Sequence, residues 1–293
     1  MNAATWGLYG LAVLIWGSTW LVITFQLGTV APEASIVYRF ALAAALLFGW
    51  AFLRRLPLAF DRAAHGRFLL QGVFLFCINF ILFYHSERFI SSGLVALICS
   101  GMAFFNMLGM WLVFGQPIKP LVALGSSVGI AGIVVVFWPE VASFDAGTVG
   151  WLGIGLATAA TFSASCGNLV SVSQRRANLP VVQSTAWAML YGTGLTAAYA
   201  VLAGIPFGFD PSLKYLASLA YLVVFGSVVA FMSYLTLIAR VGADKAAYVN
   251  VTVPIVALLL SALVEGFRWQ LMTFIGIGLS LLGNLLVMRA GKR

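Results

Sequence analysis

Aromatic and polar side chains inside long apolar segments are the residues of this sequence that could do chemistry. Trp16 and Trp20 are four residues apart in the run "WGSTW" and therefore share one face of a helix. Two rings so placed could form a stacking wall for an apolar or aromatic solute, or they could be packing residues. Trp16 lies near the middle of its segment, away from the interfacial depth where tryptophan is usually enriched. Trp187 and Tyr191 repeat the spacing later in the chain.

Polar groups at mid-segment depth form a second set. Asn79 lies in "FCINFILFY", where an amide needs partners, and it could line a cavity or join two helices. Pro254 removes a helical bond from a carbonyl near Asn250. That oxygen could face a cavity or a substrate amine, or neighbouring helices could satisfy it; the kink also supplies a hinge. The residues predicted to contact substrate are Trp16, Trp20, Arg39, Asn79, Tyr84, Ser100, Met102, Trp187, Tyr191, Tyr234, Tyr248, Asn250 and Thr252.

Two residues that can carry charge lie near predicted helix ends. His85 could titrate near neutral pH and gate the outer end, or it could be an exposed interfacial histidine. Arg39 lies a turn or two inside its segment, where snorkelling to the headgroups is the default and pairing with a substrate carboxylate is the alternative. No Asp or Glu falls at mid-membrane depth, which predicts weak or no carboxylate-based coupling and export down a gradient or by exchange.

The composition shows what kind of elements must position these residues. Of 293 residues 62% are hydrophobic and 8% are charged, and the mean hydropathy is +1.04. A soluble domain carries roughly 25% charged residues, so this chain is predicted to have a lipid bilayer as its partner and no nucleic acid, despite its net charge of +8. Cys77, Cys99 and Cys166 lie in apolar segments without ligand-like spacing, and no metal or cofactor is expected.

Ten segments are long and apolar enough to span a bilayer, which takes roughly 20 residues each. The sequence therefore predicts an all-α integral membrane protein with ten transmembrane helices. Their expected ranges are 5–25, 33–53, 66–86, 91–114, 119–138, 148–172, 182–203, 214–238, 245–264 and 269–289.

The charges between these segments predict the orientation. With the N-terminus in the cytoplasm, 12 of the 16 basic residues fall on the inner side. Six of the eight acidic residues fall on the outer side. By the positive-inside rule both termini are expected in the cytoplasm.

The two halves of the chain are expected to be related. Gly125 and Gly132 have the same spacing as Gly276 and Gly283, in similar last helices of residues 1–140 and 141–293. Because each half has five helices, the second half would enter the membrane from the opposite side. This predicts two inverted five-helix repeats around a central cavity. The small-residue faces Gly125-x-x-x-Gly129 and Gly276-x-x-x-Ser280 predict close packing between the halves or, as a second interpretation, dimerisation.

Several motifs resemble the drug/metabolite transporter superfamily and its EamA-like exporters, most closely the aromatic amino acid exporter type. They are "WGSTW", the run "YRFALAAALL" from Tyr38, and "VTVPIVALLLSALVEG" from Val251. The resemblance implies a cavity lined by helices one to four and six to nine, with helices five and ten outside it. It also implies export of amino acids or similar metabolites across a bacterial inner membrane. The chain lacks the Pro near Gly101–Met102 and the Glu near Phe114–Gln116 that such proteins often have.

The predicted function is a secondary transporter that exports small metabolites, chiefly aromatic and other neutral amino acids, by alternating access. The alternatives are an exporter or exchanger of purines, nucleotide sugars or cationic drugs, or a passive channel. An enzyme is not expected, because both histidines lie outside the apolar core and no catalytic set is present. The protein is expected to be a monomer or a homodimer.

Overall fold

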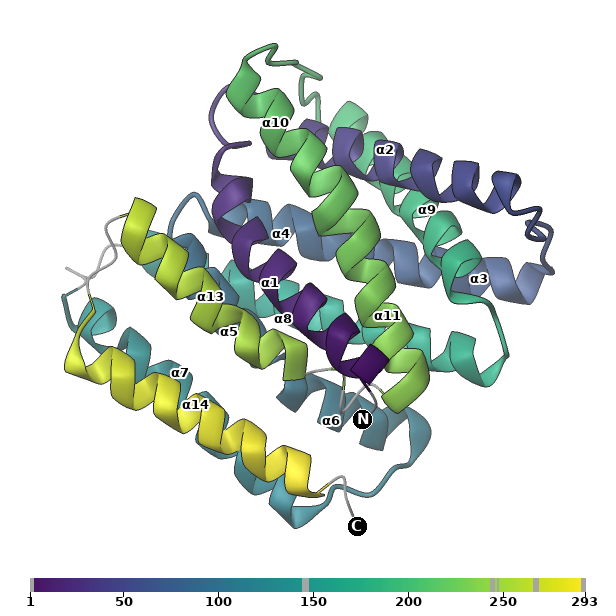
Figure 1. The fold of residues 1–293 in the computed structure, drawn as a ribbon. Helices are drawn as coiled ribbons and strands as arrows, with labels where there is room; N and C mark the ends of the chain where they lie inside the picture. The colour runs from purple at the N-terminus through teal and green to yellow at the C-terminus, as the bar shows by residue number, and fades with distance from the viewer. Residues whose placement is uncertain (1–2, 144–147, 243–245, 247, 266–268, 291–293) are drawn as a thin grey trace.

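The regular elements of the protein are helices packed into one bundle (Figure 1). The computed structural model describes residues 3–143, 148–242, 246, 248–265 and 269–290. The elements of the first half are α1 (Ala3–Thr24), α2 (Pro32–Leu53), α3 (Arg62–Gln71), η1 (Gly72–Ile78), α4 (Asn79–Ser86), α5 (Ser92–Ser100), α6 (Met102–Phe114) and α7 (Pro120–Ser143). Those of the second half are α8 (Thr148–Arg176), α9 (Val181–Leu202), α10 (Leu213–Tyr221), η2 (Leu222–Val229), α11 (Ala230–Val241), α13 (Tyr248–Val264) and α14 (Leu271–Ala290).

The apolar segments of the sequence became helices, with differences at their ends. The fifth segment was expected to stop at 138, but α7 continues through Pro139 to Ser143. The sixth was expected to stop at 172, but α8 continues to Arg176. Both errors arose because a proline or a polar cluster was taken as the helix end, although a long helix can continue past either one.

Five helical stretches among the described residues are long and apolar enough to cross a membrane. They are Ala3–Thr24, Pro32–Leu53, Arg62–Ser86, Ser92–Phe114 and Leu213–Val241. Large apolar side chains such as Leu53, Leu202 and Leu263 point outward with most of their surface exposed. An outer surface of this kind fits a lipid environment and not water.

Helix ends follow local sequence signals. The Asp61 side chain accepts a hydrogen bond from the Ala64 N–H at 2.7 Å and so caps the start of α3. Ser212 caps α10 in the same way. Gly115 ends α6 with a φ of 65°, a left-handed conformation that glycine adopts without a steric penalty.

The helices α7 and α14 lie side by side at one edge of the bundle (Figure 1). A Cβ on Gly132 would lie 2.5 Å from the Gly276 carbonyl oxygen, so the two backbones approach too closely for any side chain there. The Ser280 hydroxyl donates to the Gly129 carbonyl at 3.3 Å. The small-residue faces therefore pack against each other within one chain, as the first of the two interpretations predicted.

Two π-helical stretches interrupt otherwise α-helical spans. η1 lies between α3 and α4, and η2 lies between α10 and α11. Neither was predicted. A π-helical stretch shifts the register of side chains along a helix and is frequent at functional sites. Leu75 of η1 lines the cavity described next, and η2 directly precedes α11, which also lines it.

Candidate functional site

A cavity lies in the middle of the bundle, between helices from both halves of the chain. Its walls come from α1, α2, η1, α4, α5 and α6 in the first half and from α8, α11 and α13 in the second. The lining residues are Trp16, Thr19, Trp20, Ile23, Arg39, Leu75, Asn79, Phe80, Phe83, Cys99, Met102, Ala164, Asn168, Phe231, Tyr234 and Val253. α7 and α14 contribute none of these residues.

The cavity is narrow in this conformation. It has about 70 Å³ of open space, whereas pockets that bury a drug-sized ligand typically have about 300–1,000 Å³. A few water molecules fit, but a whole metabolite does not. Binding of a solute therefore requires the walls to move apart.

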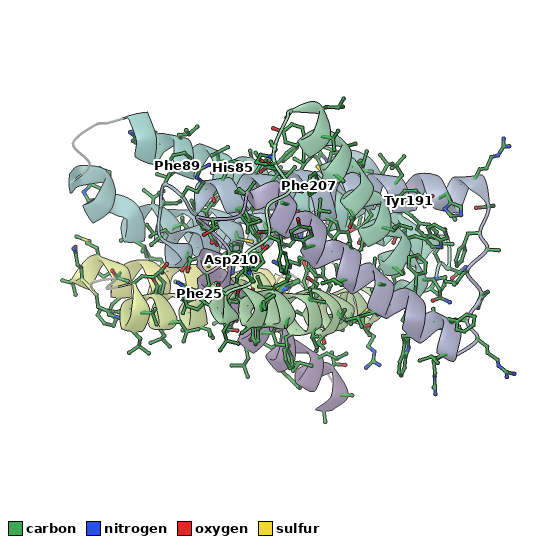
Figure 2. The ribbon with its side chains drawn as sticks, turned by 90° about the horizontal axis from the view of Figure 1, so that it is seen from above. Phe25, His85, Phe89, Tyr191, Phe207 and Asp210 are labelled. Carbon is green, nitrogen blue, oxygen red and sulfur yellow. The ribbon has the colours of Figure 1, made fainter. Side chains whose placement is uncertain are left out.

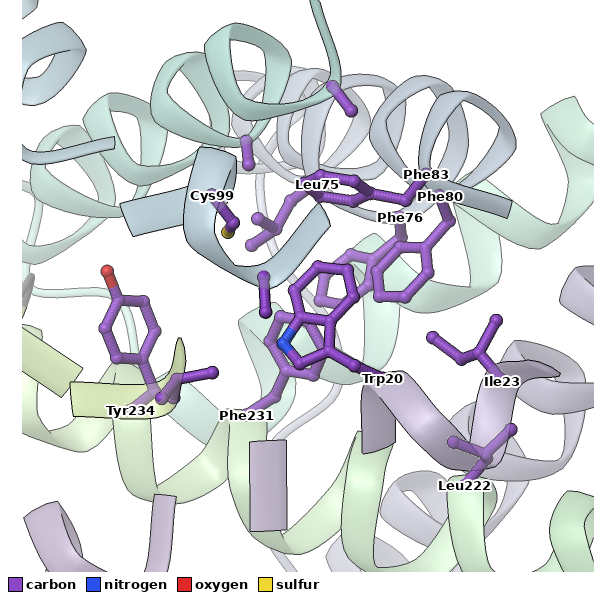
Figure 3. Packing of buried hydrophobic residues seen from close by; sticks show 14 of the residues in the cluster. Trp20, Ile23, Leu75, Phe76, Phe80, Phe83, Cys99, Leu222, Phe231 and Tyr234 are labelled. Carbon is purple, nitrogen blue, oxygen red and sulfur yellow. The ribbon is translucent and has the colours of Figure 1, made fainter. Parts of the chain in front are cut away.

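Aromatic rings form most of the wall, and Figure 3 shows Trp20 among several of them. The Trp20 ring meets the Phe83 ring edge-on, with centroids 5.0 Å apart. Trp16 contacts Phe231 at 5.1 Å and Tyr234 at 4.8 Å. The Trp16 indole N–H also donates to the Gly226 carbonyl in η2 at 3.3 Å, which fixes the ring. Such a wall suits an apolar or aromatic solute.

Arg39 brings a positive charge into this aromatic surrounding. Its side chain is only 1% exposed, so it does not snorkel to the surface as the default expectation had it. Nε donates to the Ser227 hydroxyl at 2.8 Å, and one terminal nitrogen lies 3.4 Å from the Tyr84 hydroxyl. The guanidinium carbon lies 4.8 Å from the centre of the Phe80 ring.

No carboxylate neutralises this arginine within the described part of the chain. The one ion pair found there joins His85 to Glu33. A buried charge without an opposite charge is costly. Arg39 therefore lacks an anionic partner. A guanidinium has five N–H groups, and those of Arg39 that are not used by Ser227 and Tyr84 could bind an anion.

Two amide oxygens supply hydrogen-bond acceptors to the same cavity. Oδ1 of Asn79 and Oδ1 of Asn168 are buried and accept no hydrogen bond. The nitrogen of the Asn168 amide donates to the Tyr234 hydroxyl at 3.2 Å and to the Met102 sulfur at 3.1 Å. Free acceptors inside a largely apolar cavity suit a solute that carries N–H donors.

Tyr84 and His85 lie next to the cavity and not in its wall. Tyr84 is fully buried and supports Arg39 through its hydroxyl. The His85 Nε2 lies 2.8 Å from the Glu33 carboxylate. His85 is therefore neither freely exposed nor part of the cavity wall. It connects the last turn of α4 to the first turn of α2. Figure 2 shows it on the other side of the molecule from Tyr191.

Trp187, Tyr191 and Ser100 lie outside the cavity, although they belong to the predicted set. The rings of Trp187 and Tyr191 stack on each other, and the Tyr191 hydroxyl lies 2.9 Å from Nδ1 of His65. The Ser100 hydroxyl donates to the Leu97 carbonyl of its own helix at 2.6 Å. The spacing of these residues suggested a shared face, but only packing decides which face points inward.

The predicted residues of the ninth segment are only partly described. Thr252 forms a hydrogen bond with the Tyr9 hydroxyl, and Pro254 is buried inside α13. The side chains of Tyr248 and Asn250 lie outside the described part of the structure. In this helix Val253 is the residue that lines the cavity.

Sequence reasoning did not select several wall residues. Phe83 lies four residues after the selected Asn79, and Phe80 lies four residues before the selected Tyr84. Phe231 lies three residues before the selected Tyr234. A helical-face search around each selected residue could have found all three. Asn168 was visible as a polar residue at mid-segment depth, and nothing in the sequence set it apart from the serines around it.

Comparison with known proteins shows which family the chain belongs to. The model of the EamA-like transporter family matches residues 5–138 and residues 151–289. The chain belongs to the EamA-like transporter family. EamA-like proteins are transporters, which agrees with a cavity between helices of both halves and with the apolar outer surface.

Curated relatives of this EamA-like chain include several proteins from enteric bacteria. Protein PagO of Salmonella typhimurium is 25% identical over 263 residues, which cover 89% of this chain and 84% of PagO. The inner membrane transporter YedA of Escherichia coli is 27% identical over 278 residues, which cover 94% of this chain and 87% of YedA. A probable amino-acid metabolite efflux pump of Escherichia coli is 27% identical, with 93% of this chain and 91% of the pump covered.

A solved crystal structure has the same fold. It superposes with a TM-score of 0.76 over 100% of this chain and 99% of the other, at 18% sequence identity. The relatives named as inner membrane transporters and the apolar helices support an integral inner membrane protein.

Proposed function

We propose that this EamA-like protein is a secondary transporter that exports neutral amino acids, aromatic ones included, by alternating access. The observation that carries the proposal is the buried Arg39 without a carboxylate partner, in an aromatic cavity that also holds free amide oxygens. A zwitterion satisfies both kinds of group at once. Its carboxylate can bind Arg39, and its ammonium can donate to Asn79 and Asn168.

The aromatic residues of the cavity wall would contact the side chain of the amino acid. Trp16, Trp20, Phe83 and Phe231 present apolar faces to the space next to Arg39. An aromatic or branched apolar side chain fits there without leaving a polar group unpaired. A purine or nucleotide sugar would bring several further polar groups that this wall does not match.

The proposal includes ten spans built as two inverted five-helix repeats, 1–140 and 141–293, with both termini in the cytoplasm. It is supported by the family match on each half. It is further supported by the π-helical stretches η1 and η2, which interrupt the third and eighth predicted spans at equivalent places. α1 begins and α14 ends at the same end of the bundle (Figure 1).

In alternating access the two halves move relative to each other around a fixed site. The narrow cavity fits this mechanism, because the walls come from both halves and separate when the halves move. A place where helical bonds can rearrange lies within the wall at η1 and directly before the wall helix α11 at η2.

The test is counterflow in proteoliposomes with three related solutes: phenylalanine, phenethylamine, which lacks the carboxylate, and phenylpropionate, which lacks the amine. We expect saturable counterflow that is fastest for phenylalanine. Arg39→Gln should abolish the preference for phenylalanine over phenethylamine, because the variant loses the group that binds the carboxylate. Arg62→Gln, at an exposed arginine at the start of α3, is the matched control and should transport like the wild type.

Other outcomes contradict the proposal. Flux that does not saturate would indicate a channel. Transport of purines or cationic drugs in preference to phenylalanine would indicate another substrate class. An Arg39→Gln variant that inserts normally and keeps its preference for phenylalanine would exclude Arg39 as the carboxylate site.

A further inference from the structure

Glu87 is a buried carboxyl group to which neither the cavity nor the family assigns a role. It follows the last residue of α4, and 9% of its surface is exposed. Both of its carboxylate oxygens are buried, and neither has a hydrogen-bond partner in the described structure. An ionised carboxylate placed like this would lose its hydration and gain nothing in return.

The surroundings of Glu87 add a second negative group. Glu265, at the end of α13, acts on it as a like charge. The Glu265 carboxylate accepts a hydrogen bond from the Ser92 hydroxyl at 2.6 Å and another from Ser261. Arg39 attracts Glu87 only at longer range, without an ion pair. Burial, and after it the charge of Glu265, hold the pKa of Glu87 well above its ordinary value, against the weaker opposite effect of Arg39.

The remaining charged and titratable groups at this end of the bundle do not neutralise Glu87. α5, which follows it, carries no charged side chain. The other described groups are Glu33 at the start of α2 and, on the segment of Glu87 itself, Tyr84, His85 and Arg88. On the side of α10 this end also holds Tyr38, Asp210, Lys214 and Tyr215, and none of them forms an ion pair with Glu87. Arg268, three residues after Glu265, lies outside the described residues.

Glu33, at the same end of the bundle, is by contrast a buried carboxylate with a hydrogen-bond partner. It is as deeply buried as Glu87, but one of its oxygens lies 2.8 Å from the His85 ring nitrogen. The protein thus pairs one buried carboxylate with a group that can be cationic and leaves the other beside a second carboxylate. Without a cationic partner and with a second carboxylate nearby, the neutral form of Glu87 is favoured over the ionised form.

We propose that Glu87 is a proton-binding site that holds its proton while this end of the bundle is closed and releases it to water when this end opens. The O–H bond of the carboxyl group breaks, the proton passes to solvent, and a hydrated carboxylate remains. The inference rests on the proposed function only in that opening is taken to be a step of transport. It revises the expectation from the sequence that carboxylate-based coupling is weak or absent.

The direction of the pH dependence follows from linkage. The closed conformation binds the proton more tightly than the open one, where a hydrated Glu87 returns toward the ordinary glutamate value of about 4.3. Protonation therefore stabilises the closed conformation at acid pH. This stabilisation is lost as the pH rises through the raised pKa that Glu87 has in the closed conformation. If charge bias sets the orientation, this end faces outside, so acid outside should slow export.

The first experiment reads the proton directly and needs no substrate. Infrared spectra of the purified protein in lipid nanodiscs at neutral pH should contain the C=O stretch of a protonated carboxyl group. Glu87→Gln should remove this band. Glu33→Gln, the matched buried control, should leave it unchanged, because a carboxylate paired with His85 has no such band.

Two further variants test the surroundings and keep the inference falsifiable if Glu87→Gln does not fold. Glu265→Gln removes the like charge, so the band should titrate at lower pH than in the wild type. Arg39→Gln removes the attractive charge, so the band should titrate at higher pH. Shifts in these opposite directions identify Glu87 as the source.

The inference is overturned if the wild type has no protonated carboxyl band, or if the band survives Glu87→Gln. In proteoliposomes, Glu87→Gln should also remove the dependence of export on outer pH. If phenylalanine is not transported but the infrared results are as expected, the proposed substrate fails and the proton site stands. If transport is confirmed and the band is absent, the proton site alone fails.

Discussion

The central cavity and the α7–α14 pair lie in one bundle but are built from opposite kinds of residue. The cavity wall consists of large rings and contains polar groups without partners. The α7–α14 contact consists of glycines whose backbones nearly touch. Close backbone packing leaves no room for rearrangement. Large side chains around a narrow space can move apart when a ligand supplies the missing contacts. The comparison suggests that α7 and α14 are the fixed part and the cavity is the part that moves.

The largest expected effect is on the fixed part. A Cβ on Gly276 would lie 2.5 Å from the Gly132 carbonyl oxygen and also overlap Val136, so Gly276→Ala must push the helices apart. We expect a loss of stability of about 3 kcal/mol or more, at or above the upper end of the usual range for overpacked contacts, because the added Cβ would overlap backbone atoms. It would be measured as a lower Tm of the purified protein in detergent.

Gly278 provides the matched control on the same helix. A Cβ there meets no atom within 4 Å, so Gly278→Ala should leave the Tm unchanged or raise it slightly. Equal Tm values for Gly276→Ala and Gly278→Ala would remove the distinction between a fixed pair and the rest of the bundle.

The amides of the cavity are expected to give an intermediate effect, on affinity and not on folding. Asn79→Ala and Asn168→Ala each remove an acceptor for the substrate ammonium. A hydrogen bond to a charged group contributes about 1.5–3 kcal/mol. The KM for phenylalanine should therefore rise about tenfold or more in counterflow assays.

Asn106 is the control for these two variants. It is as deeply buried and accepts a hydrogen bond from Ser165 at 2.7 Å, but it does not line the cavity. Asn106→Ala should lower stability and leave the KM of the folded protein unchanged. A KM that rises equally in all three variants would mean that the amides act only through packing.

The smallest effect is expected at Ser100. Its hydroxyl donates to a carbonyl of its own helix and lies away from the cavity, although the sequence placed it in the predicted site. Ser100→Ala should change neither the Tm nor transport by more than about 0.5 kcal/mol, the usual range for a neutral substitution. A clear loss of transport would extend the site beyond the cavity described here.

Of the residues predicted to contact substrate, six line the central cavity, and that they bind substrate stays a prediction. Trp16, Trp20 and Asn79 all line the cavity, together with Arg39, Met102 and Tyr234. Trp187 and Tyr191 had the same spacing as Trp16 and Trp20, yet they pack around His65 instead. Spacing along one helix says which residues share a face, but not which face meets the other half of the chain.

The sequence by itself determined the class of protein and the positions of its apolar helices. Both depend on composition and on runs of about twenty residues, which are local properties. The tertiary structure decided which polar groups have partners. Arg39 bonds to Ser227, 188 residues away, and Glu87 meets Glu265 across the bundle. Burial and pairing of a charge depend on groups brought together only by folding. The local sequence therefore could not distinguish a snorkelling arginine from a buried one, or a solvated glutamate from a buried one without a partner.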